Sequence, residues 1–144
     1  MNKEEILTTL TTKDTVKGYR LFEQMEKDSA KTAVYYDYID DFAKLLDSKN
    51  AYVRIRSFSL ICYQARWDEE NRIDKYIDKM LMLLNDDKPI VVRKCLEALH
   101  ELLVFKNYND KVLEVLNNMH TQKYADSMKP LIDKDIAELR KNLI

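Results

Sequence analysis

The sequence predicts an all-α protein in which about four helical pairs stack into an α–α superhelix. The first observation is a repeat, because Tyr38-Ile39-Asp40 recurs 38 residues later as Tyr76-Ile77-Asp78. The second is composition, because one glycine and two prolines in 144 residues leave few points at which a helix must stop. Two-helix repeats of this length bury their apolar faces only against one another, so they stack in a row.

The helical pairs of this single domain are expected at about residues 3–30, 33–67, 71–106 and 109–142. In the second and third pairs, apolar residues recur at intervals of three and four, which is the spacing of one helix face. Asp14 or Thr12 can accept the free N–H groups at the start of the second helix. Pro89 can begin the second helix of the third pair, where its missing N–H costs nothing.

Composition and charge exclude several classes of protein. The formal net charge of -1 provides no overall field that attracts nucleic acid or an anionic membrane. Cys62 and Cys95 are isolated, so they indicate neither a disulfide framework nor a zinc site. The sequence contains no apolar run of the length that spans a membrane and no signal peptide, so we expect a cytoplasmic protein. No motif indicates a cofactor, so we expect none.

Two segments carry a resemblance to a known family. Leu45-Leu46-Asp47 followed by Val53-Arg54, and Leu83-Leu84-Asn85-Asp86 followed by Val92-Arg93, resemble the HEAT-repeat (armadillo-like) pattern. The whole chain is also similar to short bacterial HEAT-like proteins, some of which are labelled "SufBD protein". That label suggests iron–sulfur assembly, but two isolated cysteines provide no set of cluster ligands. The resemblance implies a small helical-repeat binding module.

Arg54 and Arg93 open the second helices of these two repeats. They could bind an external anion. We expect instead that they pair with the acids of the preceding turns, Asp47 and Asp86, because ion pairs that join units are the commoner role of such arginines.

A stripe of polar and aromatic residues is the main candidate for a binding surface. It consists of Tyr52, Arg56, Ser59, Tyr63 and Arg66. Spacings of four and three residues place all five on one side of a helix, opposite its core face, and the family resemblance makes this side the inner surface. Tyrosine and arginine are enriched among the residues that dominate protein interfaces. The alternative is an ordinary solvated helix face.

The corresponding stripe of the next repeat extends the predicted surface. Lys94, Glu97 and Glu101 belong to it, and their mixed signs argue against a continuous track for nucleic acid. The segment from Lys49 to Arg66 has four basic residues and no acidic one, which leaves open a local contact with an anion.

The same region allows two further interpretations. Trp67 and Asp68, close to Arg56 and Arg66, resemble the residue types that HEAT-like DNA-alkylation-repair proteins use, so a nucleic-acid-binding module is the alternative function. Asp68-Glu69-Glu70 could hold a divalent ion, but acids at a helix start are the simpler explanation. No catalytic motif indicates an enzyme.

The sequence therefore predicts a non-catalytic adaptor or scaffold that binds another protein or a peptide. The partner's identity and the oligomeric state stay open. We place Arg56 and Tyr63 at the centre of the surface. Accordingly, Arg56→Glu combined with Tyr63→Ala is expected to abolish partner capture with little loss of stability.

Overall fold

The computed structural model describes residues 2–143, which form eight α-helices and no strand. The helices are α1 (Lys3–Thr11), α2 (Thr15–Lys31), α3 (Ile39–Lys44), α4 (Ala51–Tyr63), α5 (Ile77–Leu81), α6 (Pro89–Phe105), α7 (Asn109–Asn117) and α8 (Lys129–Arg140). Short 3₁₀ segments lie at Tyr36–Tyr38, Leu45–Asp47, Gln64–Trp67, Arg72–Lys75, Met82–Asn85 and Thr121–Lys123. The prediction of an all-α protein is confirmed.

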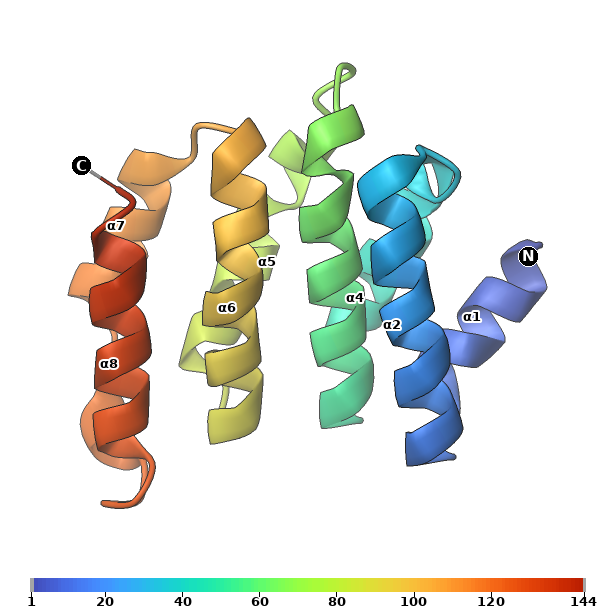
Figure 1. Cartoon of the computed structure of the whole chain (residues 1–144). Helices are drawn as coiled ribbons and strands as arrows, with labels where there is room; N and C mark the ends of the chain where they lie inside the picture. Colours follow the sequence, from blue (N-terminus) through green and yellow to red (C-terminus); the bar gives the residue numbers. More distant parts are fainter. Residues whose placement is uncertain (1, 144) are drawn as a thin grey trace.

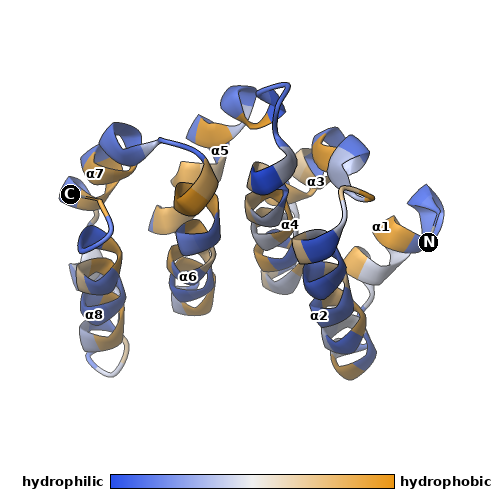
Figure 2. Cartoon of the chain, turned by 45° about the horizontal axis from the view of Figure 1, so that its top comes forward, coloured by the Kyte–Doolittle hydropathy of each residue, from blue (hydrophilic) through white to orange (hydrophobic). Residues whose placement is uncertain are grey.

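The helices lie in two layers. Figure 1 shows α2, α4, α6 and α8 side by side with their chains running in the same direction, and α1, α3, α5 and α7 behind them. Each long helix packs against the next one along the chain, α2 against α4, α4 against α6 and α6 against α8. The long helices carry hydrophobic residues on one side and hydrophilic residues on the other (Figure 2).

The second layer is less regular than the sequence predicts. The first helix of the pair predicted at residues 33–67 is short, because α3 has only six residues and continues into the 3₁₀ segment Leu45–Asp47. The amide of Ser48 donates to the carbonyl of Leu45 at 3.1 Å. This tighter bond satisfies a terminal carbonyl that an α-helix would leave without a partner.

Side chains cap several helices in the way that the sequence indicates. The carboxylate of Asp14 accepts the amide of Lys17 at 3.0 Å, which confirms Asp14 as the cap of α2. The side chain of Asn50 accepts the amides of Tyr52 and Val53 at the start of α4. Pro89 begins α6 as predicted.

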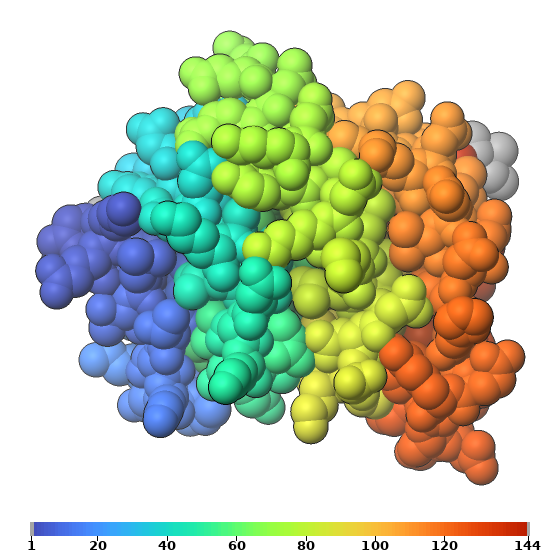
Figure 3. Space-filling view, turned by 180° about the vertical axis from the view of Figure 1, so that it is seen from behind, coloured from blue at the N-terminus to red at the C-terminus, as the bar shows by residue number. Residues whose placement is uncertain are grey.

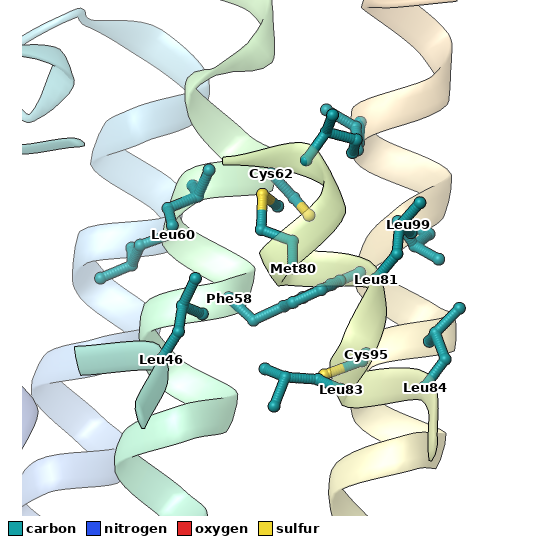
Figure 4. Close-up of a cluster of buried hydrophobic side chains, with 14 of the residues drawn as sticks. Leu46, Phe58, Leu60, Cys62, Met80, Leu81, Leu83, Leu84, Cys95 and Leu99 are labelled. Carbon is teal, nitrogen blue, oxygen red and sulfur yellow. The ribbon is translucent and has the colours of Figure 1, made fainter. Parts of the chain in front are cut away.

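The core lies between the two layers. Phe58 and Leu60 of α4 and Met80 of α5 are fully buried in it (Figure 4). Cys62 and Cys95 are free thiols in the same core, and burial raises the pKa of both. Neither thiol is therefore placed to react with a solute.

The face formed by the second layer is filled by successive parts of the chain. Seen from behind in Figure 3, bands of residues follow one another across this face in sequence order.

Within residues 2–143, no helix has both the length and the apolar character that crossing a membrane requires.

Candidate functional site

A groove of about 540 Å³ crosses the long helices, and we call it the α2–α4–α6 groove. It is lined by Thr15, Tyr19, Phe22, Glu23 and Glu26 of α2, by Tyr52, Ile55, Arg56, Ser59 and Tyr63 of α4, and by Ile90, Lys94, Glu97, Ala98 and Glu101 of α6. None of these residues belongs to the second layer. The volume falls in the range of about 300–1,000 Å³ that is typical of ligand sites.

The groove brings together most of the predicted surface. Seven of its eight residues line the groove: Tyr52, Arg56, Ser59, Tyr63, Lys94, Glu97 and Glu101. The eighth, Arg66, lies beyond the lining and forms an ion pair with Glu101 at 2.7 Å. Whether these residues bind a partner stays a prediction.

Arg56 does not stand at the centre of an exposed stripe, and that expectation is wrong. Its side chain is only 5% exposed. The guanidinium Nη1 donates to the carbonyls of Leu10 at 3.2 Å and Thr12 at 3.4 Å, at the C-terminal end of α1. Terminal carbonyls of a helix lack partners within the helix, and a cation is favoured there. Arg56 therefore holds α1 against α4.

Gly18 makes room for this arginine. A Cβ atom at Gly18 would lie 2.9 Å from Nη2 of Arg56 and 2.6 Å from Cγ2 of Thr12. A glycine inside a helix usually weakens it, but the missing side chain of Gly18 permits the close approach of α1, α2 and α4.

Ser59 is also buried, which corrects its predicted exposure. Its hydroxyl donates to Oε2 of Glu26 at 2.7 Å, so a polar contact joins α4 to α2 inside the groove. This contact fixes the direction of the Glu26 carboxylate without neutralising its charge.

Arg66 lies against aromatic rings, in the 3₁₀ segment Gln64–Trp67 that follows α4. Its guanidinium carbon is 5.4 Å from the ring centre of Tyr63 and 4.9 Å from that of Phe105. The same guanidinium forms the ion pair with Glu101 of α6. Phe105 is half exposed, because Arg66 covers only one side of its ring.

The basic segment from Lys49 to Arg66 does not form a basic surface. Arg54 binds Asp86 through two hydrogen bonds of 2.9 and 3.0 Å, and Arg56 is turned to backbone carbonyls. Arg66 pairs with Glu101. Three of the four cations therefore already have partners within the protein.

Arg54 and Arg93 form ion pairs as expected, but not with the acids of the preceding turns. Arg54 pairs with Asp86 of the following turn rather than with Asp47. Arg93 pairs with Asp135 of α8 at 2.7 Å rather than with Asp86. Both arginines reach forward along the chain to the next long helix or its turn, not back to their own.

Helix α2 contributes to the groove, which the sequence pattern did not lead us to expect. Tyr19, Glu23 and Glu26 face the groove, and the Tyr19 side chain is 57% exposed. The signal was present, since Tyr19, Glu23 and Glu26 have the same spacings of four and three residues as the stripe on α4.

The electrostatic potential of the groove acts on Glu26. Partial burial raises the pKa of its carboxyl, and the neighbouring charges of Glu97 and Glu23 raise it further, while the Ser59 hydrogen bond and Lys94 lower it. Glu97 belongs to α6 and Glu23 to α2. Carboxylates therefore repel one another across the width of the groove.

Trp67 and Asp68 have structural contacts. The indole Nε1 of Trp67 donates to the carbonyl of Ser29 at 2.8 Å. The carboxylate of Asp68 accepts the amides of Arg72 at 2.8 Å and Ile73 at 3.2 Å, so it caps the 3₁₀ segment Arg72–Lys75. Asp68 thus acts as an acid at a helix start. Among residues 2–143, no group of three or more potential ligands is placed to hold a metal ion.

Comparison with known proteins gives no relative for this chain. No family model matches it, and no curated protein or solved structure does so either. The HEAT-like resemblance therefore stays a prediction, and function has to be argued from the geometry of the groove.

Proposed function

We propose that this chain is a non-catalytic adaptor or scaffold, a short HEAT-like stack of helical pairs that holds a partner protein or peptide in the α2–α4–α6 groove. The observation that carries the proposal is the set of three tyrosines on its walls. Tyr19 of α2 and Tyr52 of α4 are more than half exposed, and Tyr63 of α4 is partly buried beside Arg66. Exposed tyrosines in a concave site are typical anchors of protein interfaces.

The order of the helices supports the stacked arrangement. Each long helix packs against the next, and Arg54 and Arg93 each reach an acid of the following unit. A stack of this kind leaves one side of the long helices without a covering layer, which is the usual binding side of helical-repeat proteins.

Nucleic acid is a less suitable ligand for the groove. Four glutamates line it against one arginine and one lysine, and the arginine is committed to backbone carbonyls. Phosphate backbones require an excess of available cations. We therefore expect no salt-dependent shift of DNA or RNA in gels run at low ionic strength.

Site-specific cross-linking in the native cell tests the proposal. The photoreactive residue p-benzoylphenylalanine replaces Tyr19 or Tyr52 in the groove, or Met82 as a matched exposed position in the second layer. We expect both groove positions to capture the same protein, identified by mass spectrometry, and Met82 to miss it. Equal capture from all three positions, or none from the groove, would contradict the proposal.

A further inference from the structure

The charges of the α2–α4–α6 groove are not balanced. Lys94 is 3.6 Å from Glu97, and Glu101 is paired with Arg66. In the described part of the chain, no lysine, arginine or histidine forms an ion pair with Glu23 or Glu26, although 15 ion pairs join other residues. The α2 wall therefore presents to the groove two carboxylates that have no ion-pair partner in the described chain.

Glu26 is held in place at this wall. Its carboxylate accepts the Ser59 hydroxyl at 2.7 Å, and that hydroxyl is itself buried. A carboxylate oriented by a neighbour in a partly desolvated site loses little freedom when it binds a cation. Its remaining lone pairs are available to a donor from outside the chain.

The groove also provides aromatic surface next to these charges. Tyr19 lies on the same helix as Glu23 and Glu26, and Tyr52 and Tyr63 lie on the adjacent wall. The aliphatic stem of a lysine or arginine packs on such rings while its charged head reaches the carboxylates, and the rings themselves attract a cation.

We propose that the partner in this groove is a protein segment bearing a lysine or arginine, whose charged side chain binds between Glu26 and Glu23 of α2 and the tyrosines of α4. The proposal rests on the function proposed above and specifies the chemistry of the partner. A segment, rather than a free amine, suits the groove because Tyr52 and Ile90 extend the lining beyond the carboxylates and offer apolar contacts to flanking residues.

A library of random nine-residue peptides tests this assignment with the purified chain. We expect selected peptides to be enriched in lysine or arginine and depleted of acidic residues. The chain with Glu23→Gln and Glu26→Gln should lose this preference and bind the best peptide about tenfold more weakly, because each charge-assisted hydrogen bond is replaced by a neutral one. Binding to the unmodified chain should weaken as salt rises.

Three controls make the result decisive. Glu114→Gln on the exposed surface of α7 removes one acid outside the groove and should leave peptide binding unchanged. The melting temperature of the double variant should not fall, since the two carboxylates repel their neighbours. Cadaverine (1,5-diaminopentane) should not displace the peptide at equal concentration, and full displacement would identify a free amine rather than a segment as the ligand.

The outcomes separate this inference from the proposed function. Selected peptides without a preference for lysine or arginine would overturn the inference, while groove-specific cross-links from Tyr52 would still support a binding module. An absence of selected peptides would also overturn it. The loss of both peptide binding and groove cross-links would remove the proposed function as well.

Discussion

Charged side chains on the two sides of the long helices are used differently. Toward the turns and the second layer, charges are paired between successive units, as in Arg54 with Asp86 and Arg72 with Asp40. In the α2–α4–α6 groove, Glu23 and Glu26 form no ion pair within the described chain. Paired charges join the units, whereas uncompensated charges lower stability unless something else binds them.

Tyrosines show the same contrast. The hydroxyl of Tyr36 donates to Asp68 at 2.5 Å, and that of Tyr76 donates to Asp40. Both hydroxyls therefore form hydrogen bonds within the protein. Burial and the hydrogen bond to Asp40 raise the pKa of Tyr76 to about 12. In the groove, Tyr19 and Tyr52 remain more than half exposed. The sequence alone does not distinguish the tyrosines that are hydrogen-bonded to acids from those that are exposed in the groove.

The largest effect is expected at Asp68, the most connected of the paired charges. Its side chain is fully buried and contacts the Tyr36 hydroxyl, two backbone amides and, at 3.1 Å, the ammonium of Lys106. Asp68→Ala should lower the free energy of unfolding by about 3–5 kcal/mol, because several buried donors lose their acceptor and the largely buried Lys106 loses its nearest carboxylate. Urea denaturation measures the loss.

The exposed acid Asp37, 3.9 Å from Arg72, is the matched control for Asp68. Asp37→Ala should change the stability by no more than about 0.5 kcal/mol. Similar losses in the two variants would show that the contrast between buried and exposed pairs has no energetic meaning in this fold.

The next effect separates the two arginines that join units. Arg54→Ala should cost about 2–3 kcal/mol, because Arg54 and Asp86 are both largely buried and Arg54 also donates to the Ser48 carbonyl at 2.8 Å. Arg93→Ala should cost about 1 kcal/mol, because its pair with Asp135 is more accessible to water. Equal losses in urea denaturation would refute this ranking.

A smaller effect concerns Arg56 and Gly18. Arg56→Ala should cost about 1–2 kcal/mol, since two helix-terminal carbonyls lose their donor. Gly18→Ala should also destabilise the chain, because its Cβ meets the guanidinium. In the double variant the cost of the alanine at position 18 should be reduced, which a double-mutant cycle detects. Strict additivity would mean that the two side chains do not interact.

The burial of Arg56 also revises the first experiment that the sequence suggests. Arg56→Glu would place a carboxylate beside the carbonyl oxygens of Leu10 and Thr12, so loss of binding could simply report unfolding. Glu26 and the exposed Tyr19 and Tyr52 are better probes of the groove because their substitution leaves the packing of α1 intact.

The smallest effect is expected in the groove itself, and it has the opposite sign. Glu26→Gln should stabilise the chain at pH 7 by no more than about 0.5 kcal/mol, since the change removes a partly desolvated charge that Glu23 and Glu97 repel and Lys94 only partly offsets. Ser59 can still donate to the amide oxygen of the new side chain.

The pH dependence of this gain follows from the raised pKa of Glu26. The folded state binds the proton more tightly than the unfolded chain, so the stability due to protonated Glu26 is lost as the pH rises through the folded pKa. The advantage of Glu26→Gln should therefore be present at pH 7 and fade as the pH falls toward 4.5, the ordinary value. Thermal unfolding across this range measures it; an advantage that grows on acidification would contradict the assignment.

The sequence predicts which residues line the groove better than it predicts how exposed their side chains are. Spacings of four and three residues placed Tyr52, Tyr63 and Glu97 correctly around one groove, since helix periodicity is a local property. The burial of Arg56 depends on carbonyls at Leu10 and Thr12, which are more than forty residues away in the sequence. No local pattern encodes such a contact.

Gly18 carries a consequence for how this chain can vary. A residue with higher helix propensity would strengthen α2 in isolation, yet it would push against the guanidinium that anchors α1. The two positions are therefore coupled through space, and homologous chains should replace Gly18 and Arg56 together or not at all. A larger residue at the first position should be accompanied by a shorter side chain at the second.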